Sequence, residues 1–262
     1  MDSLSLEQLK RVTWNKNYAE VILSKLERSL SEMRYFINIP LAKRNENYAE
    51  FYSYVEIIKI VGNKPSKILD AACGRGEVAQ MLALKGHKVS ACDILDYSTL
   101  DKSLVDFKLA DLNKPLPYDD NYFDAVINNV SLQLLSYPSK FIAEITRVLK
   151  NNGNFILGIP NFHSLQGRYA FLMSGELTFY NVRDPNTKVF TNISIIYLPV
   201  LLEMLHTYGF EIVDIRANAL SHSRRLRIFD ALFGNLICDI EEKRNNVVRY
   251  SHTLIITAKL RK

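Results

Sequence analysis

Several features that mark specialised classes of protein are absent from this chain or rare in it. Cysteine occurs only at positions 73, 92 and 238, with no pairing or metal-ligand spacing. The start of the chain lacks the charged-then-apolar pattern of a signal peptide. The sequence therefore argues against a disulfide-stapled secreted domain and predicts a reduced, cytoplasmic protein.

Long hydrophobic runs and a strong excess of one charge are also missing. The longest apolar stretch, 193–205, is interrupted by Ser194, Pro199 and Glu203 and is too short to span a bilayer. The net charge of +5 is mild and does not by itself indicate a nucleic-acid partner. The 262 residues, 48% of them hydrophobic, fit one domain with additions.

The stretch 67–93 is the most informative part of the sequence. Ile68 and Leu69 indicate a short buried strand, and Gly74 and Gly76 follow in a turn. The apolar spacing of residues 78–84 predicts a helix that ends at Gly86, and residues 89–92 predict a second strand that leads to Asp93. Strand, glycine turn, helix and strand in this order open a nucleotide-binding α/β fold.

The residue types of this stretch suggest a ligand. Gly74 and Gly76 carry no Cβ, so the backbone can bend sharply and a ligand can lie against it. The following helix points its free N–H groups and its positive dipole end toward that ligand. Asp93 stands where a carboxylate can accept the two hydroxyls of a ribose.

Two ligand classes fit the glycine pattern. Gly74-x-Gly76-x-x-Ala79 with Asp93 satisfies the fingerprint for a dinucleotide. Asp70 favours the other class, because an acid beside the ligand repels a pyrophosphate and suits a sulfonium with an α-amino group. Asp70-x-x-Cys73-Gly74-x-Gly76 resembles motif I of the class I S-adenosylmethionine (SAM) methyltransferases. A glycine turn without a ligand is the third interpretation.

The pattern continues through the middle of the chain. We expect a third strand at 107–112, a turn-rich loop at 113–124 and a fourth strand at 125–128. Pro138 can start a helix that runs to Leu149 and is closed by residues 151–153, before a fifth strand at 154–160. A helix at 199–208 and strands at 210–215 and 253–260 complete the pattern.

The loop and helix after the third strand are similar to those of the UbiE/type 11 small-molecule group of SAM methyltransferases. The similarity covers residues 66–160 and rests on Asp111-Leu-x-x-Pro-Leu-Pro-Tyr-x-Asp-x-x-Phe-Asp, Pro138, and Phe141-x-x-Glu144-x-x-Arg147-Val-Leu-Lys-x-x-Gly153. The resemblance implies a Rossmann-like sheet of seven strands in which strand 7 is antiparallel. It also implies SAM as the cofactor.

The same resemblance implies a role for each matching position. The methionine part of SAM would lie against Asp70, Ala71, Ala72, Cys73, Gly74 and Gly76. Asp93 would hold the ribose, with Ile94 in the same cofactor site. Asp111 would reach the adenine amino group, with Leu112 beside the ring. Asn128 and Asn129 would face the sulfonium and the acceptor, although Asp111 and Asn128 can also be read as loop caps.

The chain departs from the family pattern after the fourth strand. Where the family often has Glu-His, this chain has Gln133-Leu134, which removes an obvious base near the sulfonium. His163, just past the fifth strand, is the best remaining candidate for a catalytic base, against a plain loop histidine. No metal site is predicted, and Asp119 and Asp120 are interpreted as turn caps rather than a metal pair.

Three segments extend the core. Residues 1–62 predict a helical N-terminal extension that packs on the sheet or covers the site, and residues 63–262 form the SAM-binding domain. The aromatic insertion 161–197 resembles insertions in methyltransferases of bacterial surface-glycan pathways. The insertion 218–251 has arginines before apolar residues at helical spacing, which fits packing, a homodimer contact, an anionic lipid surface or an acidic acceptor.

The sequence thus predicts a methyltransferase for a small-molecule or glycan acceptor. Two alternatives stay open, which are a SAM-binding protein without catalysis and a nucleic-acid methyltransferase. The second is disfavoured because Asn128-Asn129-Val130-Ser131 lacks the proline and aromatic residue that would clamp a flipped base. We therefore expect no nucleic-acid partner and no stable membrane insertion.

Overall fold

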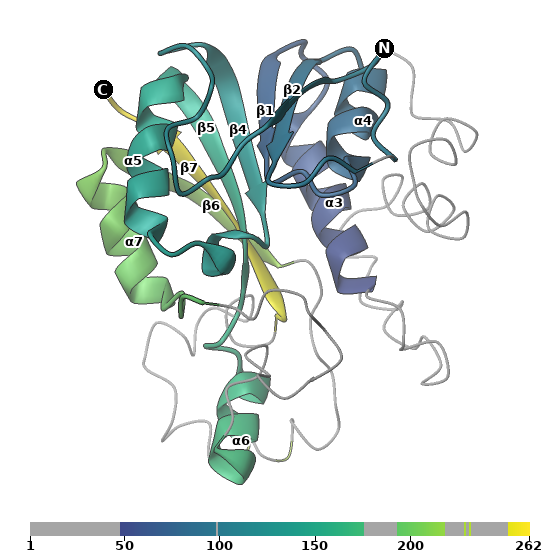
Figure 1. Ribbon diagram of the computed structural model, residues 1–262. Helices are drawn as coiled ribbons and strands as arrows, with labels where there is room; N and C mark the ends of the chain where they lie inside the picture. The colour runs from purple at the N-terminus through teal and green to yellow at the C-terminus, as the bar shows by residue number, and fades with distance from the viewer. Residues whose placement is uncertain (1–47, 98, 176–192, 218–227, 229–230, 232–250) are drawn as a thin grey trace.

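The computed structural model describes residues 48–97, 99–175, 193–217, 228, 231 and 251–262, with side chains from residue 53 onward. Within these residues seven strands form one sheet in the order β3-β2-β1-β4-β5-β7-β6 (Figure 1). The strands are β1 (Lys67–Ala71), β2 (Lys88–Asp93), β3 (Asp106–Leu109), β4 (Phe123–Asn129), β5 (Leu149–Pro160), β6 (Phe210–Ala217) and β7 (Thr253–Leu260). Strand β7 is antiparallel to both of its neighbours, so the predicted fold class is confirmed.

Helices cover the two faces of the sheet. One face carries α3 (Tyr48–Val61) and α4 (Glu77–Leu84), and the other carries α5 (Pro138–Val148) and α7 (Leu198–Thr207), as Figure 1 shows. A short 3₁₀ helix, η3 (Leu132–Leu134), follows β4, and α6 (Leu165–Ser174) follows β5. Helix α6 lies beyond the end of the sheet at which β5 stops.

Alternation along the strands explains this two-sided core. On β1, Ile68 faces the α3 and α4 side and Leu69 faces the α5 and α7 side. On β4, Ile127 likewise faces the α3 and α4 side, and Val126 faces the α5 and α7 side. Because successive side chains of a strand point to opposite faces, continuous apolar runs are what a sheet covered on both sides requires.

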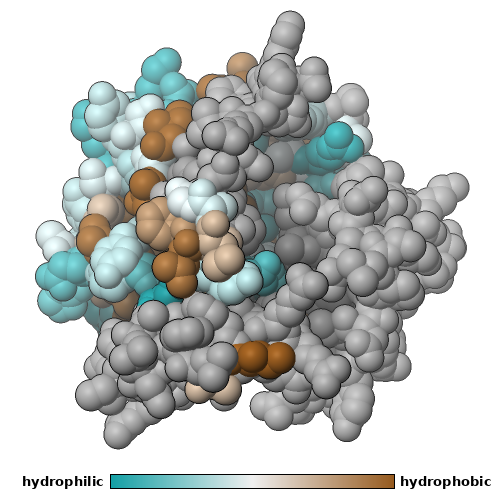
Figure 2. Space-filling model, turned by 90° about the horizontal axis from the view of Figure 1, so that it is seen from below, coloured by the Kyte–Doolittle hydropathy of each residue, from teal (hydrophilic) through white to brown (hydrophobic). Residues whose placement is uncertain are grey.

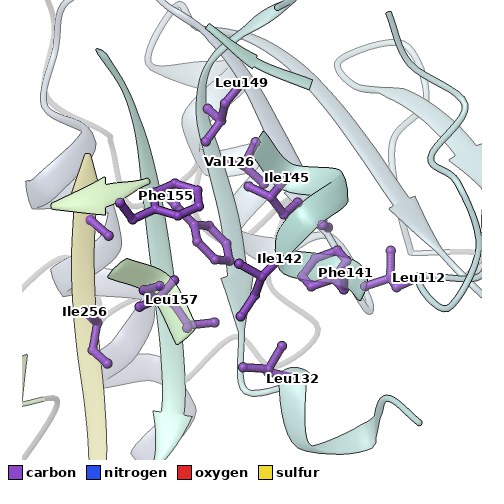
Figure 3. Packing of buried hydrophobic residues seen from close by; sticks show 14 of the residues in the cluster. Leu112, Val126, Leu132, Phe141, Ile142, Ile145, Leu149, Phe155, Leu157 and Ile256 are labelled. Carbon is purple, nitrogen blue, oxygen red and sulfur yellow. The ribbon is translucent and has the colours of Figure 1, made fainter. Parts of the chain in front are cut away.

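The face under α5 is the larger part of the core. Figure 3 shows Phe141, Ile142 and Ile145 of α5 lying against Val126 of β4 and Phe155 of β5. The three α5 side chains are at most 1% exposed. Full burial of one such side chain contributes about 1.5–3 kcal/mol. This packing fixes α5 and therefore the loop that precedes it.

Helix α3 packs into the opposite face. Val55, Ile57 and Ile58 are at most 2% exposed and belong to the core with β1 and α4. For the part of the N-terminal segment that forms α3, the interpretation as a helix packed on the sheet is therefore confirmed. Residues 1–47 lie outside the described residues, and the domain division at residue 62 stays a prediction.

Two element boundaries differ from the prediction by more than two residues. Strand β3 ends at Leu109, so Asp111 and Leu112 lie in a loop. The cause is local, because Asp111 accepts the backbone N–H of Asn113 and so closes a turn. Residues 151–153 do not close α5 but lie within β5, where Asn152 adopts a φ of 62° and the register against β4 shifts.

Candidate functional site

The glycine turn after β1 is held in a left-handed path. Ala72, Gly74 and Gly76 have φ values of 62°, 54° and 80°. The backbone N–H of Cys73 donates to the Cys92 carbonyl at 3.0 Å, which ties the turn to β2. At Gly76 an added Cβ would lie 2.2 Å from Leu100 Cδ1, so a side chain there would need a left-handed φ and a shift of the Leu100 side chain.

Gly74 faces open space. An added Cβ would meet no heavy atom within 4 Å among the atoms that do not belong to its chain neighbours. Its backbone N–H donates to Asp93 Oδ2 at 2.9 Å. The turn is thus anchored from below by β2 and open on its other side, which is what close approach of a ligand needs.

The Asp93 carboxylate, 8% exposed, braces two turns. Besides the N–H of Gly74, it accepts the N–H of Leu95 through Oδ1 at 3.1 Å. Each carboxylate oxygen can accept more than one hydrogen bond, so both keep capacity for a ribose. Ile94, the next residue, is 52% exposed although it is apolar.

Asp70 is the residue before the last in β1 and is buried, 3% exposed. Burial raises the pKa of its carboxyl from 3.8 to about 7, and the carboxylates of Asp93 and Glu77 act in the same direction. The backbone N–H of Ala79, in the first turns of α4, lowers that pKa but does not offset the other effects. Three acidic groups at one end of the glycine turn attract a cation and repel a pyrophosphate.

Asp111 and Leu112 lie on the loop after β3. Asp111 accepts the backbone and side-chain N–H groups of Asn113 at 3.0 and 3.1 Å, and these bonds, with Lys114 at 3.5 Å, lower its pKa. Leu112 is buried in the core below. Asn113 in turn accepts the backbone N–H of Ser136 at 2.9 Å. The loop is therefore connected to the segment after β4.

The turn after β4 carries the next polar group. Asn128 is fully buried, and its Nδ2 donates to the Ala71 carbonyl at 3.0 Å and to Ser131 Oγ at 2.6 Å. Val130 has a φ of 53°, which is unusual for a β-branched residue. Among the described residues, Oδ1 of Asn128 and Oδ1 of Asn129 have no protein partner.

Gly158 on β5 makes room for Asn129. A Cβ at Gly158 would lie 2.2 Å from Asn129 Oδ1 and 3.3 Å from its Cα. The carbonyl of Gly158 also accepts the N–H of Val130 at 2.8 Å. Val130 and Gly158 are positions that the sequence did not reveal, because a left-handed valine has no sequence signature and one strand glycine is a weak signal.

His163 is buried beside the start of α7. Its Nε2 accepts the backbone N–H of Leu198 at 3.2 Å, and its ring centroid lies 4.5 Å from that of Tyr197. The lone pair of Nε2 is therefore used within the protein in this arrangement. His206 is exposed on α7, and His222 lies outside the described residues. The role of His163 as a base stays a prediction.

Asp119 and Asp120 lie near α5, away from the glycine turn in sequence. Asp120 accepts from Arg147 at 2.5 Å, and Arg147 also bonds Glu144 and the carbonyls of Leu116 and Tyr118. Arg147 therefore fastens the loop before β4 to α5. Across the part of the chain that the structure describes, no group of three or more potential metal ligands occurs.

Among the described residues, no helix is long and apolar enough to cross a bilayer. Cys73 and Cys92 are buried free thiols, while Cys238 lies outside these residues. The basic segment 218–251, including Arg224, Arg225 and Arg227, lies outside them as well, apart from positions 228 and 231.

Comparison with known proteins agrees with this geometry. Residues 69–157 match the family described as "Methyltransferase domain". A Mycolicibacterium smegmatis protein described as a probable S-adenosylmethionine-dependent methyltransferase is 26% identical over 68% of this chain and 63% of its own length. A Thermotoga maritima protein named demethylmenaquinone methyltransferase is 29% identical over 60% of this chain and 75% of its own. The chain spans 60–63% of the first mycobacterial relatives.

Solved structures show the same fold. A SAM-dependent methyltransferase from Archaeoglobus fulgidus superposes with a TM-score of 0.55 at 18% identity and covers 79% of this chain and 92% of its own. Residues 69–157 are thus similar to a methyltransferase domain, and the relatives of this chain include proteins described as dependent on S-adenosylmethionine as cofactor. Asp70, the open face of Gly74 and Asp93 fit that cofactor in charge and in space.

Proposed function

We propose that this chain, built on a class I methyltransferase domain, transfers a methyl group from SAM to a small-molecule or glycan-type acceptor. One observation carries the proposal: a left-handed glycine turn, braced by Asp93 and open at Gly74, lies beside the buried acid Asp70. The positive sulfonium and α-amino group suit this acidic environment, whereas the pyrophosphate of a dinucleotide does not.

The proposed cofactor residues lie at or just after the carboxyl ends of the parallel strands β1, β2, β3 and β4. In the proposal the methionine part lies along Asp70, Ala71, Ala72, Cys73, Gly74 and Gly76. Asp93 accepts the ribose hydroxyls, and the exposed apolar Ile94 supports the adenine from one side. Asp111 and Leu112 reach the adenine from the loop after β3. Asn128 and Asn129 line the methyl-group side.

The cofactor supplies an activated methyl group with a neutral thioether as the leaving group. The protein therefore has to align the acceptor on the far side of the methyl and exclude water. The buried amide oxygens of Asn128 and Asn129 accept hydrogen bonds but are not bases. A neutral amine needs no base here, because the ammonium that forms loses its proton to solvent after the transfer. A preformed anion needs none either, because it gives a neutral product directly.

The acceptor class is the open part of the proposal. Several relatives are named demethylmenaquinone methyltransferase. A quinol-type acceptor therefore has to be included among the acceptors that are tested. The likeness of segment 161–197 to glycan-pathway insertions makes surface-glycan precursors the second member. A homodimer through residues 218–251 also stays a proposal.

The test is transfer of a tritiated methyl group from SAM. Acceptors are the small-molecule fraction of a cell extract, a demethylated quinol, a surface-glycan fraction, and RNA and DNA. The proposal expects label in a small-molecule or glycan fraction. Label in nucleic acid would instead support the nucleic-acid alternative, and SAM binding without transfer to any fraction would support the non-catalytic one.

A further inference from the structure

The segment between β5 and α7 begins and ends at the same edge of the sheet. We call residues 161–164 the entry stem and residues 193–198 the exit stem. The entry stem is held by the chain before β7: the Asn161 N–H donates to the His252 carbonyl at 2.8 Å, and Asn161 Nδ2 donates to the carbonyl and hydroxyl oxygens of Ser251, both at 3.0 Å. Asn161 is 1% exposed.

The exit stem is held by the turn after β4. The N–H groups of Ile193 and Ser194 both donate to the Gln133 carbonyl at 2.9 Å, and Ser194 Oγ donates to the Leu135 carbonyl at 2.7 Å. Ile196 is buried in the core below. The exit stem is therefore fixed to the turn that follows Asn128 and Asn129, the last two residues of β4.

His163 connects the two stems. Its Nε2 accepts the N–H of Leu198, and its ring packs on Tyr197. The backbone N–H of His163 donates to Asn161 Oδ1 at 3.1 Å. The backbone carbonyl of His163 accepts the Nε–H of Arg168, a residue of α6, at 3.1 Å. One residue thus contacts the entry stem, the exit stem and α6.

The bond to Leu198 also serves α7. The first N–H groups of a helix have no partner within the helix. Tyr197 precedes α7 and provides no side-chain cap, so the ring of His163 supplies from another segment what a capping side chain would supply locally. To accept this N–H, Nε2 must be unprotonated.

We propose that His163 is a positioning residue, which fastens the two stems and thereby holds α6 and the turn after β4 in the arrangement that receives the acceptor. The inference rests on the proposed methyl transfer. It differs from a base role, in which Nε2 must be free to take a proton from the acceptor.

Two substitutions separate the roles. In His163→Gln the side-chain oxygen can reach about as far as Nε2 and accept the N–H of Leu198, but it cannot act as a base. In His163→Phe the ring remains beside Tyr197 and the acceptor atom is lost. His87 provides the matched control, because it is also a buried histidine, bonded through Nε2 to the Gly62 carbonyl in the turn after α3.

The measurements are amide hydrogen exchange at Leu198, SAM affinity by calorimetry, and tritiated methyl transfer to the small-molecule extract at varied extract concentration. We expect exchange at Leu198 to be at least tenfold faster in His163→Phe and near wild type in His163→Gln. Turnover should fall at least tenfold in His163→Phe, mainly through a higher apparent KM for the extract. His163→Gln should keep at least a third of the turnover.

The opposite pattern overturns the proposal. If His163→Gln protects Leu198 yet loses turnover as fully as His163→Phe, His163 is a base. If neither variant changes turnover or exchange, the residue has no role in the site. His87→Gln should leave both readouts unchanged, and an equal effect there would reduce His163 to general stability. Failure of the wild type to bind SAM would contradict the proposed function, whereas exchange at Leu198 would still test the contact.

Discussion

The cofactor side and the acceptor side of this sheet edge are built in different ways. The cofactor side, after β1 and β2, is held by a contact between Gly74 and Asp93 across 19 positions of sequence. The acceptor side, after β4 and β5, is held by His163 to Leu198 across 35 positions and by Asn161 to Ser251 across 90. The first side is thus closed by a contact between neighbouring strand ends, and the second by contacts between segments much farther apart in the chain.

The surface beyond the acceptor side differs as well. Phe171, Leu172 and Met173 of α6 are each more than half exposed. Figure 2, which looks at the molecule from below, shows hydrophobic residues among hydrophilic ones on the described part of this face. By contrast, Asp70 and Asp93 beside the glycine turn are buried, and Asp93 accepts the N–H groups of Gly74 and Leu95. The comparison suggests that substitutions on the two sides separate cofactor binding from turnover.

The largest effect should come from Gly76→Ala. A left-handed φ costs an L-residue about 1–2 kcal/mol, and the contact with buried Leu100 adds overpacking of about 1–3 kcal/mol. We expect the free energy of unfolding to fall by about 2–5 kcal/mol by the sum of these effects. Calorimetry should also show weakened SAM binding, because the turn moves.

Two other glycines serve as controls for Gly76. Gly62→Ala has the same left-handed strain with no atom nearby, so only about 1–2 kcal/mol should be lost, with SAM affinity unchanged. Gly158→Ala displaces Asn129 and should reduce turnover while SAM affinity stays within about threefold, or ~0.6 kcal/mol. Equal loss of SAM affinity in Gly76→Ala and Gly158→Ala would break the distinction between the sides.

Asp93→Ala should have the next largest effect, on SAM affinity. The substitution leaves the N–H groups of Gly74 and Leu95 without their acceptor and removes the ribose partner. We expect a loss of about 2–4 kcal/mol in SAM binding, since a partner to a charged group is removed from a buried site. Asp93→Asn keeps one acceptor oxygen and should lose less. Unchanged calorimetric affinity in a folded Asp93→Ala variant would mean that the ribose is bound elsewhere.

The pH dependence of SAM binding should report on Asp70. Its pKa of about 7 lies above the ordinary 3.8, so its contribution to the stability of the ligand-free fold is fully present below 3.8 and is lost as the pH rises through about 7. A cationic ligand favours the ionised carboxyl. SAM affinity should therefore rise by up to about tenfold per pH unit, ~1.4 kcal/mol, below pH 7 and level off above it.

Asp70→Asn is the control for this profile. Its SAM affinity should be weaker and independent of pH over the same range, because the carboxyl that titrates beside the cofactor is gone. The pH dependence of SAM affinity in both proteins should be measured by calorimetric titration from pH 5.5 to pH 8.5. This range covers about one and a half pH units on each side of the expected transition. A flat profile in the wild type would show that Asp70 does not face the cofactor.

The smallest effect should come from Asp120→Ala. Both partners of the Asp120–Arg147 pair are partly exposed, with 66% and 32% of their side-chain surface accessible. Exposed pairs contribute at most about 1 kcal/mol, so thermal unfolding should shift little. Magnesium or calcium should not stabilise the wild type. Metal stabilisation that Asp120→Ala abolishes would restore the metal-pair interpretation of Asp119 and Asp120.

The sequence predicted the sheet well, whereas the roles of the cofactor residues stay predictions. The strands, the glycine turn and the acid at the end of β2 follow from periodicity and residue types, and the sheet of seven strands with an antiparallel β7 follows from the family resemblance. The failures have local causes. A side-chain turn at Asp111 ended β3 early, and a left-handed Asn152 let residues 151–153 join β5.

The acceptor side could not be predicted in the same detail. The strained φ of Val130 and the contact of Gly158 with Asn129 depend on how two strands meet, and neither residue type signals it. His163 was singled out for its position after β5, but its contact with Leu198 exists only once α7 has folded against the sheet. The position of His163 in the sequence thus indicates that the residue lies near the site, but not that its ring accepts the N–H of Leu198.

The most direct test of the account is calorimetric titration of the purified chain with SAM, with its demethylated product S-adenosylhomocysteine and with NAD. The acidic glycine turn predicts one site for SAM and for S-adenosylhomocysteine, with Kd on the order of micromolar, or about −8 kcal/mol, and no measurable binding of NAD. Tight binding of NAD without binding of SAM would contradict the account.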